Sequence, residues 1–413
     1  MSKIVTSLLL ASFMALPVTA QDLIKNYNVV NPNAETWQDA PVEIGGMDGY
    51  RSALVTVDGK EVPCQLDDLD GDGGADHLFF LTTIKGKDRQ SVKVSLWRQG
   101  EPRNYKQRTF ADIILPNSKI KEKNKQNVYL KEFTVMGGSD PFRCIHQHGV
   151  VFESELTAFR IYCSPRQTVD LYGKYKRQLE LKESEFYPDK EQLANGFGDD
   201  VLLVGDGVGL GALNGWNGTE PVAFTDCESR SQRVLASGPL RSIVEIIDRN
   251  WRPAAGSEPF TLTTRYTLMA GHRDCKVDVQ VSVPKGFTVS KAIKDTPYYI
   301  GITNIRGSKA WTDHQGLLAC WGSDYPAKGD TTTQTKQTVG LAVCIPPKNV
   351  EKRADTKYDY GYVVKIPQTR LTYFIAFCSD KEENGYHSEE AWRKATSEWE
   401  SGLRKKSLII MKK

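Results

Sequence analysis

Short segments of β-type residues recur along most of this 413-residue chain, and this pattern restricts the fold more than any other feature. In residues 52–57 (SALVTV), 91–97 (SVKVSLW) and 276–283 (KVDVQVSV), apolar or β-branched residues alternate with polar ones. A period of two places one face of a strand in a core and the other in water. Turn signals such as Asp58-Gly59 separate these segments. The sequence therefore predicts an all-β protein made of antiparallel strands.

The strand pattern changes along the chain and indicates two β units. Residues 21–120 contain a compact series of short strands, which predicts a smaller N-terminal β unit. The polar stretch 117–127 has the composition of a linker or an exposed crossing loop. Residues 128–413 contain longer, aromatic-rich strands, which are typical of a large antiparallel β-sandwich. Helical periodicity is clear only near the end, where Ser388 would cap a helix from Glu389 to about Leu403.

The first 20 residues have the features of a secretory signal peptide. Lys3 precedes an apolar run, and Thr19-Ala20 forms a small-residue cleavage site before Gln21. The first residue after this site is Gln21 and not the cysteine that a lipoprotein anchor requires, so such an anchor is disfavoured. No later apolar stretch is long enough to span a bilayer. The sequence therefore predicts a periplasmic or secreted protein without a membrane span.

The eight cysteines are scattered singly along the chain. An oxidising compartment permits disulfides between them, whereas buried free thiols would act as small apolar side chains. Both alternatives stay open at the level of sequence.

The charge balance argues against a polyanionic partner. The chain has 54 basic and 51 acidic residues, for a net charge of +3, and its aromatic residues do not interleave with a basic patch. We therefore expect no nucleic-acid partner. An acidic ligand would have to be bound by individually placed Arg and Lys side chains. The sequence leaves the oligomeric state open.

An Asp- and Gly-rich loop could bind a cation. Its carboxylates alternate along the chain, as they do in calcium loops, at Asp68, Asp70, Asp72 and Asp76. An EF-hand would also need Glu at the twelfth position, which Phe79 occupies. We favour a turn in which the Asp side chains satisfy the backbone, with a structural calcium site as the alternative.

The richest set of reactive side chains lies between residues 139 and 175. On a strand, side chains two residues apart share a face. Three pairs have this spacing: His146 and His148, Arg160 and Tyr162, and Tyr172 and Lys174. His and Tyr can act as base and acid, while Arg or Lys can hold a carboxylate. The same histidines could instead be packing or surface residues, or ligands of zinc or manganese.

Two further places could contribute to a site. The sequence Gly271-His272-Arg273-Asp274 forms either a structural corner or a turn that delivers His272 and Arg273 to a cleft. Trp216 follows a Gly-rich stretch, 205–215, whose spacing fits no phosphate-binding motif. Its ring could stack on a sugar or lie in the core.

Several strings resemble one known family. They are DPFRCIHQHGVVFESELTAFRIY (140–162), DLYGK (170–174), AGHRD (270–274), QLDDLDGDG (65–73) and GFGDD (196–200). The chain resembles secreted Bacteroidota proteins that are described as a domain of unknown function and are encoded among polysaccharide-utilisation genes. In that family the His stretch often reads as three histidines, but here Gln147 holds the middle position. The resemblance implies a carbohydrate-active β-sandwich related to galactose-mutarotase and lyase supersandwiches. We expect no required cofactor, apart from the structural calcium considered above.

Together, the polar pairs and the resemblance predict a carbon–oxygen lyase. It would act on uronic-acid-containing oligosaccharides by β-elimination, as a polysaccharide lyase or an oligosaccharide dehydratase. The base would be His146 or His148, and the acid Tyr162 or Tyr172. Arg160 and Lys174 would bind the substrate carboxylate. The other candidate substrate-binding residues are His272, Arg273 and Trp216.

Two other functions stay open. A glycoside hydrolase could pair Glu153 or Glu155 with Asp199 or Asp200. Its carboxylates would lie roughly 5 Å apart for retention or 6.5–9.5 Å apart for inversion. A glycan-binding module without turnover would instead leave the polar side chains dispersed rather than gathered in one place.

Overall fold

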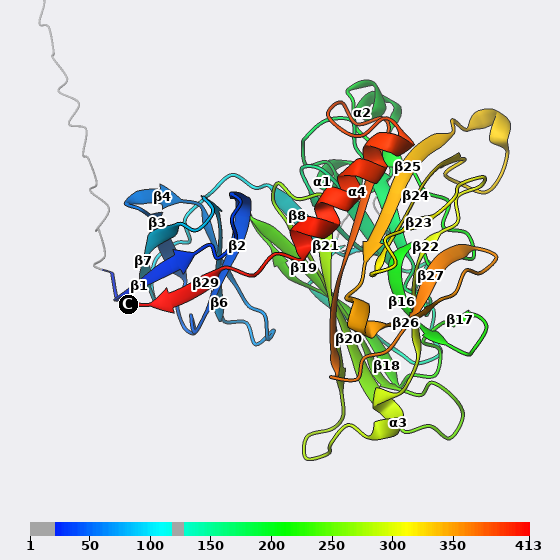
Figure 1. Ribbon diagram of the computed structural model, residues 1–413, viewed down its shortest axis with the longest axis horizontal. Helices are drawn as coiled ribbons and strands as arrows, with labels where there is room; N and C mark the ends of the chain where they lie inside the picture. The colour runs from blue at the N-terminus through cyan, green and yellow to red at the C-terminus, as the bar shows by residue number, and fades with distance from the viewer. Residues whose placement is uncertain (1–20, 118–127) are drawn as a thin grey trace, which may run out of the picture.

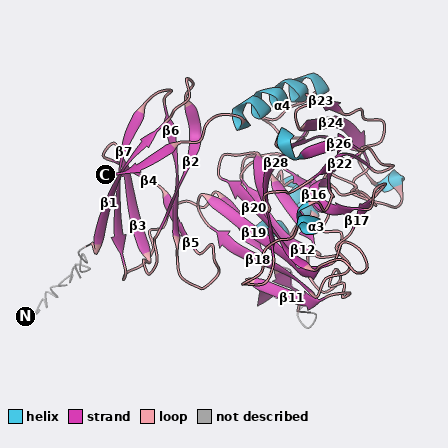
Figure 2. Ribbon diagram, turned by 60° about the horizontal axis from the view of Figure 1, so that its bottom comes forward, coloured by secondary structure: helices cyan, strands magenta, loops and turns pink. Residues whose placement is uncertain are grey.

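The computed structural model describes residues 21–117 and 128–413 (Figure 1). The predicted signal peptide and most of the expected linker lie outside these residues. Strands dominate the described chain, and every ladder between named strands is antiparallel (Figure 2). The predicted all-β sandwich with a C-terminal helix is confirmed.

The smaller body in Figure 1 is a sandwich of two sheets. Its core holds Val29, Val55, Phe80 and Val94, which come from both sheets. One sheet has the order β29 (Ile409–Lys412), β1 (Leu23–Val30), β7 (Arg89–Trp97), β3 (Ser52–Val57) and β4 (Lys60–Val62). The other has the order β2 (Trp37–Gly45), β6 (His77–Ile84) and β5 (Cys64–Asp67).

Sheet membership crosses the domain limits that the sequence suggested. β29, at the C-terminal end of the chain, pairs with β1, so the final residues join the smaller sandwich rather than the larger one. β8 (Thr109–Asp112), expected within the N-terminal unit, pairs with β12 (Gly149–Ser154) of the larger sandwich. Both differences arise from long-range pairing, which local residue patterns do not encode.

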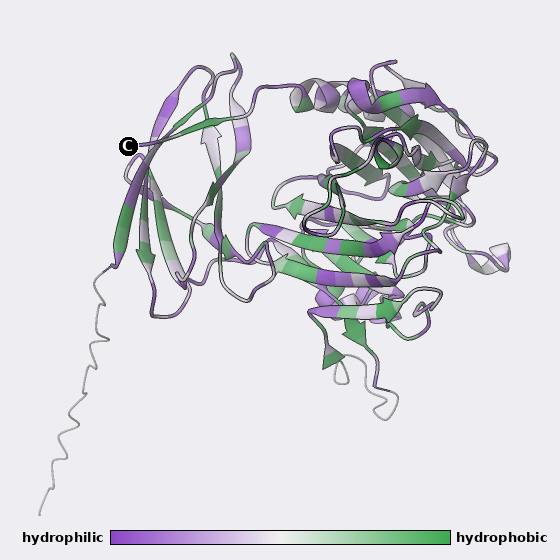
Figure 3. Ribbon diagram, turned by 90° about the horizontal axis from the view of Figure 1, so that it is seen from below, coloured by the Kyte–Doolittle hydropathy of each residue, from purple (hydrophilic) through white to green (hydrophobic). Residues whose placement is uncertain are grey.

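One face of the larger body is a nine-stranded sheet. Along β21, buried residues alternate with more exposed ones, as the pattern of 276–283 predicts; Figure 3 shows hydrophobic and hydrophilic residues interspersed along the strands. The order is β11 (Glu132–Met136), β18 (Ser229–Ser237), β19 (Arg241–Trp251), β20 (Phe260–Met269), β21 (Asp274–Ser282), β28 (Arg370–Ser379), β25 (Gln337–Cys344), β24 (Leu317–Asp324) and β23 (Trp311–Thr312).

Two five-stranded sheets share one large core with the nine-stranded sheet. The first has the order β15 (Asp199–Asp200), β14 (Val169–Gly173), β13 (Ala158–Tyr162), β12 (Gly149–Ser154) and β8. The second has the order β17 (Pro221–Val222), β16 (Leu210–Trp216), β22 (Tyr298–Thr303), β27 (Asp359–Val364) and β26 (Val350–Arg353).

Short elements connect these sheets. They are the strand pair β9 (Ile114–Leu115) and β10 (Val128–Tyr129), the helices α1 (Leu181–Ser184), α2 (Lys190–Ala194) and α3 (Lys291–Lys294), and two 3-10 turns at Thr331–Thr333 and Pro347–Asn349.

The long helix α4 (Glu389–Leu403) has the predicted bounds. The Ser388 hydroxyl accepts a hydrogen bond from the Ala391 amide at 3.2 Å and so caps the helix. Trp392 packs with Ala319 and Ala342 on the outer face of the nine-stranded sheet. A Cβ on Gly340 would come within 2.5 Å of the Trp392 ring, so this close approach needs glycine.

All eight cysteines are free in the structure, seven of them buried and Cys144 exposed. Among the alternatives that the sequence left open, the structure therefore has free thiols. Within residues 21–117 and 128–413, no helix has the length and apolar character needed to cross a membrane.

Candidate functional site

The first five-stranded sheet has a core face and a polar face. Phe152, Phe159 and Leu171 point into the large core. Because side chains alternate along a strand, Arg160 and Asp170 lie on the opposite face. Residues 181–187 cover that face, where Leu181 and Phe186 pack with Val151, Ala158 and Tyr172. The sheet and this cover hold the polar residues between them.

Arg160 is the centre of this polar group and is only 2% exposed. Its guanidinium donates to the hydroxyl of Tyr162 at 2.8 Å and to that of Tyr187 at 2.7 Å. It also forms an ion pair with Asp170, and Asp200 lies 3.6 Å away. One buried cation therefore organises two phenols and two carboxylates. We call this set the Arg160 cluster; it consists of His146, His148, Arg160, Tyr162, Asp170, Glu185, Tyr187 and Asp200.

Tyr162 is held as a proton donor. Its hydroxyl donates to Asp170 Oδ2 at 2.7 Å while it accepts from Arg160. Burial, followed by the charge of Asp170, raises the pKa of Tyr162 far above that of an ordinary phenol, and Arg160 opposes this only in part. Tyr162 therefore keeps its proton at neutral pH.

His148 is held in one orientation. Its backbone has a φ of 62°, its ring stacks on Phe142 with centroids 4.1 Å apart, and its Nδ1 lies 2.7 Å from the Phe142 carbonyl oxygen. A carbonyl can only accept, so Nδ1 carries the proton and Nε2 of the neutral ring is an acceptor. Burial lowers the pKa of His148, so the ring is neutral at physiological pH.

His146 contacts a carboxylate on the covering segment. Its Nε2 lies 2.8 Å from Glu185 Oε2, and the Glu185 side chain is 4% exposed. Glu185 and Phe186 are consecutive non-glycine residues with φ values of 50° and 70°. Such left-handed backbone is costly for these residue types and is found where the surrounding structure demands it. This turn directs Glu185 to His146. It also directs Tyr187, which follows Phe186, to Arg160.

Tyr187 joins the cluster although the sequence does not single it out. Its ring centroid lies 6.2 Å from that of His146 and 6.4 Å from that of His148. Tyr187 is 42% exposed, whereas Tyr162 is mostly buried. It follows α1 and shares no periodic spacing with the strand residues, so no local signal identifies it. The left-handed turn that places it is a tertiary feature.

Lys174 and Tyr172 do not join the cluster. Lys174 is 1% exposed, and its ammonium donates to Glu153 and to the carbonyls of Ser154 and Gln178. These bonds use all three ammonium hydrogens, so the predicted role of Lys174 at a substrate carboxylate does not fit its position. Tyr172 is fully buried against Phe186, and so its predicted role as acid does not fit either. The period of two along a strand predicts on which face of the sheet a side chain lies. It does not predict which other segment packs over that face.

The carboxylates considered for hydrolysis are dispersed. Glu153 is fully buried and bound to Lys174, so it cannot reach a substrate. Glu155 lies 2.6 Å from Arg108 and accepts the Gly271 amide. Asp200 lies in the Arg160 cluster with a side chain that is 29% exposed. Burial and Asp170 raise its pKa well above that of an ordinary carboxyl.

The other predicted substrate-binding residues lie elsewhere. His272 contacts Asp274 and the Asp39 carbonyl, next to the smaller sandwich. Arg273 pairs with Glu382 at 2.7 Å. Trp216 is on β16, where its ring stacks on Tyr299 at 5.4 Å. Of the nine predicted catalytic and substrate-binding residues, four meet in the Arg160 cluster: His146, His148, Arg160 and Tyr162.

The Asp-rich loop brings several carboxylates together, and it is also a turn in which Asp side chains accept hydrogen bonds from backbone amides. Ligand atoms of Asp68, Asp70 and Asp72 lie within 4.8 Å of one another. Asp68 oxygens accept the amides of Gly71, Asp72 and Gly73, as the turn interpretation predicts. Asp76 turns away and contacts His77 and the Leu69 amide. Three of the four predicted calcium ligands are therefore together, and calcium binding itself stays a prediction.

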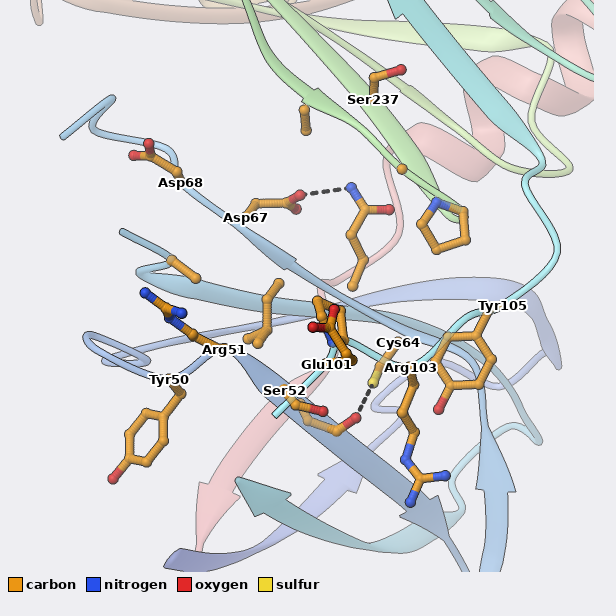
Figure 4. Close-up of a pocket in the computed structure, with 18 of the residues that line it drawn as sticks. Tyr50, Arg51, Ser52, Cys64, Asp67, Asp68, Glu101, Arg103, Tyr105 and Ser237 are labelled. Atoms are coloured by element: carbon orange, nitrogen blue, oxygen red, sulfur yellow. Dashed lines mark hydrogen bonds between the residues drawn. The ribbon is translucent and has the colours of Figure 1, made fainter. Parts of the chain in front are cut away.

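Several cavities lie away from the Arg160 cluster. One, of about 660 Å³, separates the smaller sandwich from the end of β18, and Figure 4 shows Tyr50, Arg51, Asp67, Arg103 and Tyr105 around it. A second, of about 640 Å³, lies beside α4, and a third, of about 300 Å³, borders Lys174 and Arg273.

No curated protein matches this sequence. The solved structures to which this chain is similar include a glycosyl hydrolase family 38 protein from Enterococcus faecalis and an alpha-mannosidase from Enterococcus faecalis V583. Each is 9% identical, with a TM-score of 0.45, and the match covers 94% of this chain. This chain spans less than half of their length, 47% and 46% respectively. A family model matches residues 29–409, and the chain therefore belongs to the family described as Domain of unknown function (DUF4861).

Proposed function

We propose that this protein is a carbohydrate-active enzyme, a carbon–oxygen lyase that acts on uronic-acid-containing oligosaccharides by β-elimination at the Arg160 cluster. One observation carries the proposal. A neutral, oriented histidine, His148, lies beside two tyrosines that are bonded to one buried arginine. This elimination needs a base that removes a proton, an acid that protonates the leaving oxygen, and a nearby cation that stabilises the developing negative charge.

His148 is the proposed base. Its Nε2 would take the proton from carbon 5 of the uronate, and the electron pair of that C–H bond would form the double bond between carbons 4 and 5. The lowered pKa keeps this nitrogen unprotonated at neutral pH. The stack on Phe142 and the bond from Nδ1 fix the ring, so little reorganisation is needed during proton transfer.

Tyr187 is the proposed acid. As the C4–O4 bond breaks, its hydroxyl would give a proton to the leaving oxygen, which belongs to a sugar in a lyase or to water in a dehydratase. Arg160 donates to the Tyr187 oxygen and would stabilise the phenolate that forms. Tyr187 is chosen over Tyr162 because it is 42% exposed and can reach a substrate, whereas Tyr162 is mostly buried.

Arg160 then has a different role from the one expected of it. It is 2% exposed and paired with Asp170, so its charge acts through the phenols rather than by direct contact with the substrate carboxylate. His146, paired with Glu185, lies at the outer part of the cluster with a side chain that is 32% exposed. We propose His146 as the group that faces the carboxylate.

The test is a product assay with purified protein and a panel of uronate oligosaccharides. We expect an unsaturated product, detected by ultraviolet absorption and a matching mass. His148→Asn should lower kcat by about 10²- to 10⁴-fold, the usual contribution of an acid–base group. His314→Asn is the matched control, since His314 also has a positive φ, 59°, and lies exposed far from the cluster. Asn tolerates that backbone at both positions.

The products separate this proposal from its alternatives. Cleavage without a new double bond would indicate a hydrolase. Binding without any product across the panel would indicate a glycan-binding module. Either result would overturn the lyase proposal.

A further inference from the structure

A second cavity has the chemistry of a binding groove. It has a volume of about 640 Å³, and its lining residues come from the smaller sandwich, the nine-stranded sheet and the C-terminal end of α4. We call it the α4 groove; its principal lining residues are Trp37, Phe79, Arg241, His272, Lys276 and Trp399. None of these residues belongs to the Arg160 cluster.

Two tryptophans from distant parts of the chain line this groove. Trp37 begins β2 in the smaller sandwich, and Trp399 lies on α4. Both are partly exposed, and the Trp399 indole donates to Asp274 Oδ2 at 3.2 Å. That bond fixes the ring while part of its surface remains open. Phe374 on β28 adds a third partly exposed aromatic ring to the wall.

The polar lining of the groove is held in place by ion pairs. Lys276 lies 2.8 Å from Asp278, which also accepts the Thr372 hydroxyl. Arg265 lies 2.7 Å from Glu245. Fixed pairs of this kind offer donors and acceptors side by side, which suits ligand hydroxyl groups because each hydroxyl both donates and accepts.

Arg241 provides an independent observation. It is 3% exposed, and it bonds Asp67 through Nε at 2.7 Å and Glu43 through Nη1. Its buried Nη2 has no hydrogen-bond partner among the described residues. Buried polar groups normally have partners, and a water molecule or a ligand oxygen at the groove wall beside Arg241 would supply one.

The charges of the groove lining are largely paired. Four basic residues, Arg241, Arg265, Lys276 and Lys405, line the groove with Glu43, Asp274 and Asp278, and the carboxylates of Asp67 and Glu245 lie behind Arg241 and Arg265. His272 adds a titratable group. Burial alone would lower its pKa, but the hydrogen bond and charge of Asp274 raise the pKa above the ordinary value.

We infer that the α4 groove is a second glycan-binding site, which holds an acidic oligosaccharide through the Trp37 and Trp399 rings and the fixed charges between them. Apolar ring faces, hydroxyl groups and a small negative charge occur together in such a sugar, and the volume lies in the range of small-molecule sites. Only the choice of an acidic sugar rests on the proposed function.

Binding would be measured by calorimetry and tryptophan fluorescence with tetrasaccharides of galacturonate, glucuronate and mannuronate, and with neutral cellotetraose. An acidic tetrasaccharide should bind more tightly than cellotetraose. Trp399→Ala and Trp37→Ala should each raise Kd at least tenfold. Trp216→Phe, on a different sheet, should leave Kd unchanged. Thr267→Met gives a second route, because it fills the groove without removing a packed ring.

His148→Asn separates this inference from the proposed function. It should lower kcat by about 10²- to 10⁴-fold and leave binding in the groove intact. In the wild-type protein, binding without any turnover would overturn the lyase proposal alone. Four results would overturn the inference: no binding to any member of the panel, equal affinity for cellotetraose, a Kd that Trp399→Ala and Thr267→Met leave unchanged, or a loss of binding in Trp216→Phe.

Discussion

At the scale of single residues, the chemistry of the cluster depends on environment more than on residue type. Tyr162 and Tyr172 are both tyrosines on the polar face of the same sheet, yet one bonds Arg160 and Asp170 while the other packs against Phe186. His146 and His148 are two residues apart, yet one contacts Glu185 and the other stacks on Phe142. Their different partners give them different proposed roles.

Replacement of Tyr187 by Phe tests the proposed acid. The change removes one hydroxyl from a residue that is 42% exposed, so we expect kcat to fall about 10²-fold or more and the melting temperature to change little. Tyr358→Phe is the control, because Tyr358 is 39% exposed and lies in the bend that precedes β27, outside the Arg160 cluster. Steady-state kinetics and a thermal melt decide the question. A Tyr187→Phe enzyme with wild-type kcat would rule out this role.

At the scale of elements, the buried pair of Lys174 and Glu153 joins β14 to β12 and to α1. Glu153 accepts hydrogen bonds from the amides of Glu180 and Leu181, where α1 begins. The pair therefore fixes the segment that carries Glu185 and Tyr187 over the sheet. A carboxylate at a helix start and an ammonium beside it satisfy groups that would otherwise be buried without partners.

Lys174→Met should destabilise the fold by about 3–5 kcal/mol, because it leaves the Glu153 charge buried and uncompensated. Lys365→Met is the matched control: it breaks an exposed pair with Glu351 and should change the free energy of unfolding little. Urea unfolding measures both values. Adding Glu153→Gln to Lys174→Met should recover part of the loss. A Lys174→Met protein as stable as the control would show that the pair contributes little.

At the scale of the whole molecule, the two sandwiches are joined by polar contacts as well as by apolar packing. Gln65 of β5 accepts the amides of Leu240 and Arg241 and donates to the Arg241 carbonyl. His272 links the Asp39 carbonyl of β2 to Asp274 of β21. The strand β29 closes the smaller sandwich after the chain has completed the larger one.

The His272 contact predicts a pH-dependent junction. Because the folded state raises the pKa of His272 above its ordinary value of 6.5, protonated His272 stabilises the fold fully below about pH 6.5. That stabilisation is lost as pH rises through the folded-state pKa. His272→Asn should remove this part of the pH dependence, with free energies of unfolding measured from about pH 5 to 9. Parallel profiles for the two proteins would contradict the prediction.

Local patterns determined much of the fold. The alternation in 276–283 predicts β21 because a strand with one buried face requires that period. Ser388 and the acidic residues after it predict the start of α4 because capping involves neighbours only a few residues apart. The shared face of Arg160 and Tyr162 follows from the same period of two.

The segment that covers each strand face depends on long-range packing. The left-handed turn at Glu185 and Phe186 brings Tyr187 to Arg160, and the same cover buries Tyr172 and Lys174. The return of β29 to β1 and the meeting of Trp37 with Trp399 at one groove join residues hundreds of positions apart. Residue order alone predicts which side chains share a strand face, since that depends on backbone geometry. Packing between distant segments decided which of them form a site, since it sets their burial and their partners.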